Sequence, residues 1–121
     1  MINSQRVSIR DNLLKSMAAL FSGQLNSDLT NTLLLRFPAL SFALVINWIP
    51  EQGEDIYFVL VDEKRIVVIE VPRTAAAQDA FPVVDSLNVA DYRNRKLSVD
   101  VRRKLDEALI LMREKAGTSF D

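Results

Sequence analysis

The chain contains neither cysteine nor histidine among its 121 residues. Without cysteine it can form no disulfide, thiolate nucleophile or zinc knuckle. Without histidine it lacks the one side chain that titrates near neutral pH, and therefore the Ser-His-Asp triad and the two-histidine, one-carboxylate iron site. What remains is chemistry based on carboxylate pairs, carboxylates with Mg²⁺, a Ser-Lys dyad, or Arg and Lys that clamp phosphate.

Glycine is also scarce, with three glycines and four prolines in the whole chain. No GxxxxGK[ST] or GxGxxG motif occurs, so neither of these phosphate-binding loops is present. No serine precedes a lysine by three residues, which excludes the S-x-x-K form of the dyad. We therefore predict no catalytic residues, no metal site and no cofactor, and expect no turnover of nucleic acid, phosphoesters or peptides.

The composition is that of an ordinary globular protein, with 49% hydrophobic and 26% charged residues and a net charge of −1. It predicts a single domain over residues 1–121, with residues 1–7 and 118–121 as flexible ends. No basic segment leads into an apolar run at the N-terminus, and the longest uncharged stretch, 37–50, is too short to span a bilayer. We expect no membrane segment and a cytoplasmic location.

Helices are predicted in the first third of the chain. Ser8 and Asp11 form a capping box that predicts a helix over residues 9–22, ended by Gly23. A shorter helix is expected after Ser27, where leucines recur at helical spacing until Pro38 stops it. A strand through Thr32–Phe37 remains an alternative for its second half.

Two further helices are predicted at the C-terminal end. Asn88 is the expected cap of a short helix that ends near Arg95, and Ser98 begins the last helix, which Gly117 closes. Charged pairs four residues apart, Arg102–Asp106 and Arg103–Glu107, are expected on its polar side. The apolar stripe of this helix comprises Val101, Leu105, Ala108, Leu109, Met112 and Ala116.

The centre of the chain predicts three strands, over residues 40–49, 56–61 and 65–71. Their short connections indicate an antiparallel meander, to which Phe81–Val84 would add a fourth, edge strand. Alternation in the first strand places Trp48 on the same face as Leu44 and Ile46. The other two strands are apolar on both faces, which requires cover on both sides or a partner at an edge. The fold class is α+β, a three- to four-stranded antiparallel meander flanked by N- and C-terminal helices.

Acidic residues without any basic neighbour occupy the two turns between these strands. They are Glu51, Glu54 and Asp55 on the first turn and Asp62 and Glu63 on the second. Consecutive turns of a meander lie at opposite ends of the sheet, so two acidic patches are expected, and either suits docking of a basic partner. Acidic turns are also explained by solvent exposure alone. Trp48, beside the first turn, is interpreted either as a partner-binding anchor or as a cap on the core.

Two other patterns bear on possible chemistry. The basic run Arg93–Lys104 is interpreted as a solvated helix surface, because a pI near 5.5 is far from that of nucleic-acid-binding domains, so no nucleic-acid partner is expected. The element order is similar to the core of the PD-(D/E)xK nucleases, with Asp62 and Glu70 as potential Mg²⁺ ligands. Arg73 stands near the place of the required lysine and Pro72 interrupts the strand. A small carboxylate- and Mg²⁺-dependent enzyme is therefore the second alternative.

The size, the element order and the acidic turns between Trp48 and Lys64 together resemble those of bacterial immunity proteins. These proteins neutralise the toxins of contact-dependent growth inhibition. The resemblance implies a stoichiometric inhibitor of a toxin domain, such as a basic nuclease. No diagnostic motif accompanies it, so no functional residue is carried over. The chain is also similar to type III secretion chaperones, which combine a three-stranded antiparallel sheet with flanking helices, and this class is the first alternative.

Overall fold

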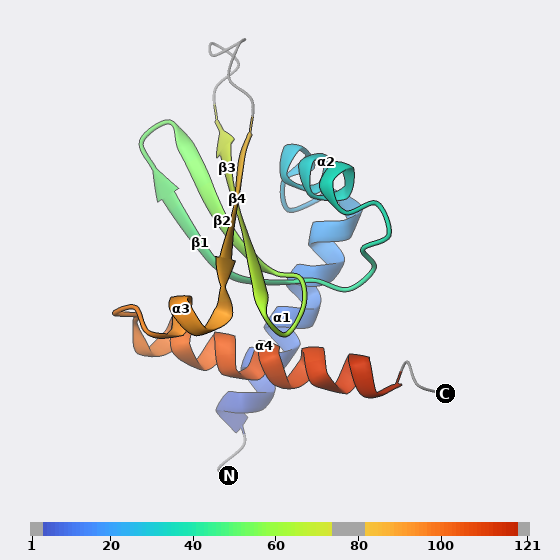
Figure 1. Cartoon of the computed structure of the whole chain (residues 1–121), viewed down its shortest axis with the longest axis vertical. Helices are drawn as coiled ribbons and strands as arrows, with labels where there is room; N and C mark the ends of the chain where they lie inside the picture. The colour runs from blue at the N-terminus through green and yellow to red at the C-terminus, as the bar shows by residue number, and fades with distance from the viewer. Residues whose placement is uncertain (1–3, 74–81, 119–121) are drawn as a thin grey trace.

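A computed structural model describes residues 4–73 and 82–118 and shows a four-stranded antiparallel sheet with strand order β1-β2-β3-β4 (Figure 1). The predicted α+β meander is confirmed, and the open question of a fourth strand is settled in favour of one. The elements in chain order are α1 (Ser4–Ser22), α2 (Ser27–Arg36), β1 (Leu44–Glu51), β2 (Glu54–Leu60), β3 (Arg65–Pro72), β4 (Val83–Asn88), α3 (Val89–Arg93) and α4 (Val99–Thr118).

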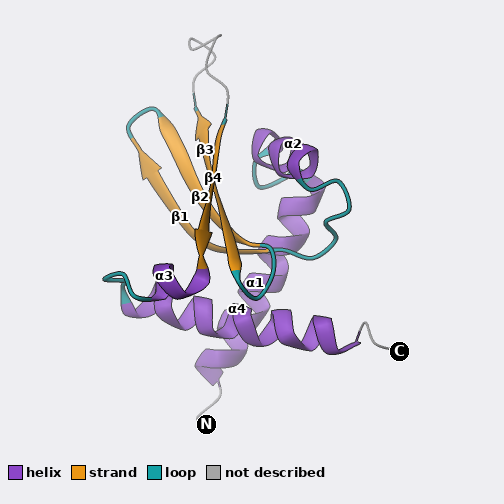
Figure 2. Ribbon diagram, in the orientation of Figure 1, coloured by secondary structure: helices purple, strands orange, loops and turns teal. Residues whose placement is uncertain are grey.

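Each face of the sheet carries its own apolar core. On the first face, Leu44, Phe58 and Ile66 pack with α1, α3 and α4. On the second face, Val59, Val67 and Ile69 pack with α2 and the C-terminal part of α1. The cover on both sides that the apolar strands required is thus supplied by helices, and Figure 2 shows them at the lower end of the sheet and beside its upper part.

Helix α1 contributes to both cores, through Leu13 to the first and Leu20 to the second. Its end is tied to α2 by Thr30, whose buried hydroxyl donates to the carbonyl of Leu20. Asn26 caps α2 by accepting a hydrogen bond from the amide of Leu29 at 3.1 Å. One helix therefore fixes the position of the two helical layers relative to each other.

Several predicted boundaries are wrong by a turn of helix or a few residues. Helix α1 begins at Ser4, so Ser8 is not its cap, and residues 4–7 are helical. Helix α4 continues through Gly117 to Thr118, while α3 stops at Arg93. The remaining residues expected to be flexible, 1–3 and 119–121, lie outside the described residues.

The two ambiguous segments are resolved by the structure. Thr32–Arg36 is helical, and Phe37 leaves the helix with φ −131° and ψ 75°, as expected for a residue before proline. The fourth strand runs from Val83 to Asn88 rather than over Phe81–Val84, and Phe81 lies outside the described residues. Asn88 caps α3 as predicted, accepting from the amide of Ala90.

A β-bulge in β1 overturns the predicted orientation of Trp48. Val45 pairs with Val59 and Asn47 with Phe58, so Ile46 is an extra residue. Leu44 and Ile46 contact the first core, but Trp48 stacks on Tyr57, which belongs to the second. The strict alternation that the sequence suggested is broken at one residue, and every side chain beyond it changes face.

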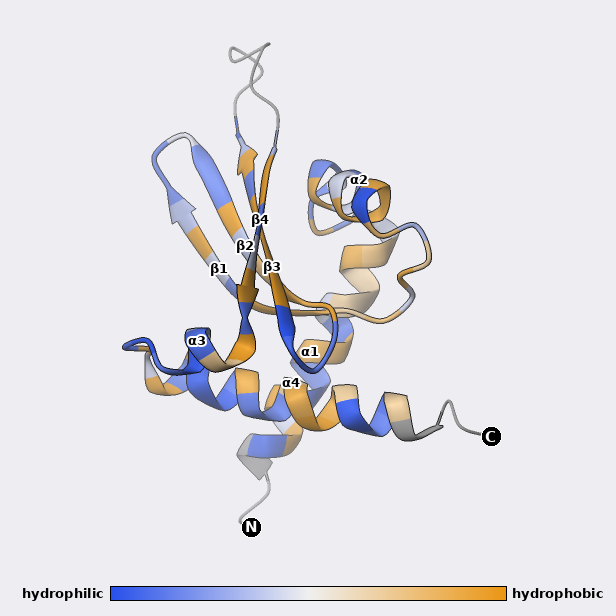
Figure 3. Cartoon of the chain, viewed as in Figure 1, coloured by the Kyte–Doolittle hydropathy of each residue, from blue (hydrophilic) through white to orange (hydrophobic). Residues whose placement is uncertain are grey.

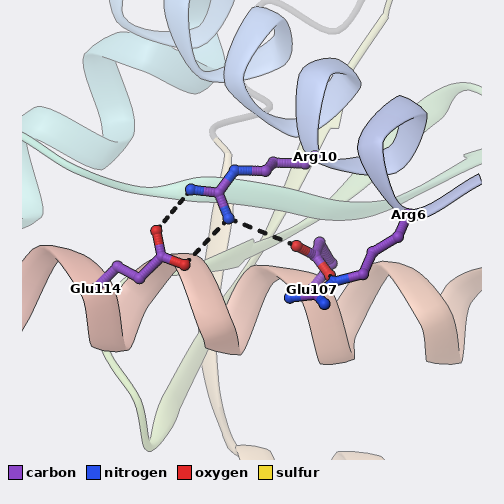
Figure 4. Close-up of polar contacts among 4 residues, drawn as sticks. All are labelled: Arg6, Arg10, Glu107 and Glu114. Carbon is purple, nitrogen blue, oxygen red and sulfur yellow. Dashed lines mark hydrogen bonds and ion pairs between the residues drawn. The ribbon is translucent and has the colours of Figure 1, made fainter. Parts of the chain in front are cut away.

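The predicted charge pairs within α4 do not form. Glu107 is instead buried against α1, where Arg6 Nε donates to its Oε2 at 2.8 Å and Arg10 Nη1 lies 3.7 Å from its Oε1 (Figure 4). Arg10 also binds Glu114, and this contact lowers the pKa of that carboxyl. Asp106 pairs with Arg93 rather than with Arg102. The polar residues of α4 thus join it to other helices.

We predict that Leu109→Ala lowers the free energy of unfolding by about 2–5 kcal/mol, because Leu109 is buried in the first core and its removal leaves a cavity. Urea denaturation at pH 7 measures the loss. Leu35→Ala, on an exposed side chain, is the matched control and should change stability by less than about 0.5 kcal/mol. An equally small loss for Leu109→Ala would show that the stripe is not buried.

We also predict an asymmetry in the contact between α1 and α4. Replacing Arg6 and Arg10 together by Gln should lower the urea midpoint more than Glu107→Gln does. The double change leaves a buried carboxylate without a cation, whereas the partly exposed arginines can be solvated by water. Arg113→Gln serves as a surface control. Equal effects of the two changes would mean that Glu107 is reached by water in the folded protein.

Candidate protein-binding surface

The six residues expected to bind a partner lie at two ends of the sheet, as predicted from the meander. Trp48, Glu51, Glu54 and Asp55 lie at the hairpin that joins β1 to β2, which we call the hairpin tip. Asp62 and Glu63 lie on the turn between β2 and β3, near α4. In Figure 3 the upper end of β2 is hydrophilic.

The turn between β2 and β3 uses its acidic residues internally. Asp62 Oδ1 accepts hydrogen bonds from the amides of Lys64 and Arg65 at 2.8 and 2.7 Å, and its other oxygen lies 3.5 Å from the Arg65 guanidinium. Glu63 pairs with Arg113 of α4 at 3.7 Å. The turn also borders a pocket of 570 Å³ whose apolar lining includes Phe42 and Met112. The carboxylates of Asp62 and Glu63 thus have structural roles, in the turn itself and in its contact with α4.

At the hairpin tip, Trp48 and Asp55 belong to the second face. The Trp48 ring stacks on Tyr57 with 6.3 Å between centroids, and its Nε1 donates to Asp55 Oδ1 at 3.0 Å. Arg73 lies 3.2 Å from the same carboxylate oxygen and donates to the carbonyls of Glu51 and Glu54. Trp48 nevertheless stays 54% exposed. It is a fixed aromatic ring at the surface, and Asp55 is one of the groups that fix it.

Glu51 and Glu54 lie on the opposite, first face of the same hairpin. They are direct cross-strand partners, a like-charge arrangement that is unfavourable by itself. Gly53, whose φ of +85° is easily adopted only by glycine, completes the two-residue turn between them. The structure therefore divides the acidic residues of the hairpin tip, with Asp55 paired with Arg73 on the second face and the two glutamates on the first face.

Two further carboxylates join these glutamates, and the sequence did not reveal them as part of this site. Glu70 of β3 is paired in register with Ile56 of β2 and with Val83 of β4, which places it on the first face. Asp85 of β4 lies on the same face, opposite Val68. The sequence predicts Glu70 only as a potential Mg²⁺ ligand. Its approach to Asp85 depends on the register of β3 with β4, which are joined through residues 74–81 and have no short turn between them to indicate it.

The electrostatics of Glu70 reflect this gathering of negative charge. Its pKa is raised, first by loss of solvation and then by the charges of Glu54 and Asp85 and a hydrogen bond with Glu54. No ion pair joins any of the four carboxylates on this face to Lys or Arg within the described residues. The face is an uncompensated negative surface that a positively charged partner would neutralise.

The nuclease arrangement is not assembled. Asp62 lies at the turn before β3 and Glu70 near the other end of that strand, so about 20 Å of extended chain separates the two carboxylates. Among the described residues, no group of three or more acidic side chains is arranged to hold a metal ion.

Three arginines of the basic run Arg93–Lys104 form local contacts. Arg93 pairs with Asp106, and the Arg95 guanidinium lies 5.8 Å from the centroid of the Tyr92 ring. Arg102 donates to the carbonyls of Arg93 and Arg95. These contacts agree with a solvated helix surface.

No protein-family model, no curated protein and no solved structure matches this chain. Over the described residues, none of the helices combines the length and apolarity that crossing a membrane requires.

We predict that Glu70→Gln raises the thermal midpoint of the free protein at pH 7. A raised folded-state pKa means that the ionised carboxylate destabilises the fold, and this penalty disappears as pH falls below the ordinary pKa of glutamate. The difference from the unchanged protein should therefore vanish near pH 4. Glu114→Gln is the control with the opposite sign, because Arg10 lowers the pKa of Glu114 and stabilises its charged form. A lower midpoint for Glu70→Gln at pH 7 would contradict this account.

Proposed function

We propose that the chain is a non-catalytic protein that binds a basic protein domain and inhibits it in a stoichiometric complex. Bacterial immunity proteins act in this way on the toxins of contact-dependent growth inhibition. The observation that carries the proposal is the hairpin tip, which bears an exposed, fixed Trp48 on one face and, on the other, Glu51 and Glu54, whose carboxylates form no ion pair within the described residues.

Charge at this tip favours rapid association with a basic domain. Negative groups attract a basic surface over a Debye length of about 8 Å at physiological ionic strength, which raises the rate of encounter. The tip extends beyond the helices in Figure 1, and its Trp48 ring is exposed, so a partner can reach it. A partner whose active site is basic, such as a nuclease domain, presents the complementary charge.

Trp48 supplies the apolar part of the proposed contact. Tryptophan is enriched among the residues that carry most binding energy in protein interfaces. Its ring is already held by Tyr57 and Asp55, so little side-chain freedom remains to be lost on binding.

The direct test uses the protein encoded beside this gene in its source genome. Co-expression should yield a one-to-one complex by size-exclusion chromatography with light scattering, and the neighbour should lose its toxicity in a bacterial host. The chaperone alternative would be established instead if the neighbouring gene encodes a secreted effector and a dimer of this chain keeps that effector competent for export. Mg²⁺-dependent turnover by the purified chain, lost in Glu70→Gln, would establish the enzyme alternative.

With such a partner identified, we predict that the charge of the hairpin tip affects the association rate and that the Trp48 ring affects the dissociation rate. Glu51→Lys with Glu54→Lys should slow association and flatten its salt dependence, while leaving Asp55 and its contacts in place. The control, Asp11→Lys with Glu63→Lys, makes the same change in net charge away from the tip. Trp48→Ala should act on dissociation, by about 2 kcal/mol or more if the ring is an anchor. An unchanged rate and salt dependence for the tip variant would exclude this surface.

A further inference from the structure

The first face of the sheet is covered over only half of its length. Paired residues form rows across all four strands, and the row Leu44–Leu60–Ile66–Leu87 lies beneath the helices with its first three members fully buried. The row Ile49–Ile56–Glu70–Val83 is the second row beyond it on this face, counted toward the hairpin tip. There Ile49 is 36% and Val83 55% exposed. We call this region the open half-face; it comprises Ile49, Glu54, Ile56, Glu70, Val83 and Asp85.

The exposure is specific to this face and is not a property of the strand ends. Tyr57, Ile69 and Val71 alternate with the open residues along β2 and β3 and are buried on the second face. Figure 1 shows α2 beside the upper part of the strands, whereas α4 crosses near their lower ends. The two helical layers are offset, so the same strands are covered on one face and open on the other.

We infer that the open half-face is a docking site for a cationic amphipathic helix of a partner protein, a helix with a stripe of apolar residues flanked by Lys or Arg. This inference rests on the proposed protein-binding function and adds the place of contact and the kind of segment bound. Ile49, Ile56 and Val83 would receive the apolar stripe, while Glu54, Glu70 and Asp85 would pair with the flanking cations.

The dimensions suit a helix. Four strands spaced about 4.8 Å apart give a face about 14 Å wide, which just under three turns of α-helix cross. Along β2, the five residues from Leu60 to Ile56 span about 13 Å, and packed helices lie about 8–10 Å apart, so a helix fits beside α4 on the same face. The site would then complete the layer that α4 begins.

The negative charge of the open half-face favours a cationic partner over other molecules that could cover it. Its carboxylates have no cationic partner in the described part of the chain, and residues 74–81 contain no Lys or Arg. A second copy docked face to face would bring two acidic surfaces together. Nucleic acid and anionic lipid would be repelled for the same reason. A protein segment that brings positive charge and apolar side chains together meets both requirements.

The test uses a synthetic 18-residue peptide of Leu, Ala and Lys with leucines on one helical stripe. A shuffled peptide of the same composition lacks the stripe, and a third peptide has Glu in place of Lys. Binding is measured by fluorescence anisotropy at low salt, and the contact is mapped by amide chemical shifts. We expect binding of the striped peptide, at least about tenfold weaker binding of the shuffled one, and none of the acidic one. The shifts should be confined to the open half-face and the adjoining side of α4.

Matched variants assign the contact. Glu54→Gln with Glu70→Gln, and separately Ile49→Ser with Val83→Ser, should each weaken binding at least about tenfold, with folding verified by the amide spectrum. The controls are Asp11→Asn with Glu63→Gln for charge, and Val7→Ser with Leu35→Ser for exposed apolar residues. Controls that weaken binding as much, or equal binding of the shuffled peptide, would overturn the inference by showing diffuse attraction only. If the native partner instead binds both face variants unchanged but loses affinity with Trp48→Ala, the inference fails and the proposed function stands.

Discussion

The architecture depends on one constraint, namely that β2 and β3 carry large apolar side chains on both faces. Such strands need cover over much of both faces, and helices supply it on each. The chain places β1 and β4 outside these two strands and packs helices against both faces. Helix α1 reaches both cores, through Leu13 and Leu20, and therefore couples the two layers. The buried Glu107 fixes α4 to the same helix, so displacement of α1 would disturb every layer at once.

This coupling also determines what is left uncovered. With α4 held near the lower ends of the strands and α2 beside their upper part, the helices do not oppose each other across the sheet. The second face is closed toward the hairpin tip, where Tyr57 and Val71 are buried, and the first face is not. Glu54, Glu70 and Asp85 lie on this uncovered part of the first face. The candidate binding surface is thus a consequence of how a chain of 121 residues covers a two-sided sheet with few helices.

Much of the fold could be predicted from local patterns, because helical spacing, Asn88 as a cap and the short turns act over a few residues. The need for cover on both faces followed from β2 and β3 alone. The bulge at Ile46 could not be predicted, since one extra residue leaves the hydrophobic pattern almost unchanged while it reverses the side on which Trp48 lies. The same limit applies to partners distant in sequence. Glu107 had a plausible partner four residues away, yet it binds arginines of α1, and Glu70 joins Glu54 only through strand register.

The carboxylates of the open half-face link stability to binding. In the free protein, Glu70 lies beside Glu54 and Asp85, and its raised pKa shows that the folded state disfavours the charged form of this carboxyl. A cation placed among these groups removes the repulsion as well as forming its own ion pairs, so the gain on binding exceeds that of the same contact made to an isolated carboxylate. A neutral or acidic partner would leave the repulsion in place and desolvate the carboxylates further. In the proposed complex, this arrangement would favour a cationic partner over a neutral or acidic one, because only a cation relieves the repulsion between the carboxylates of the free protein.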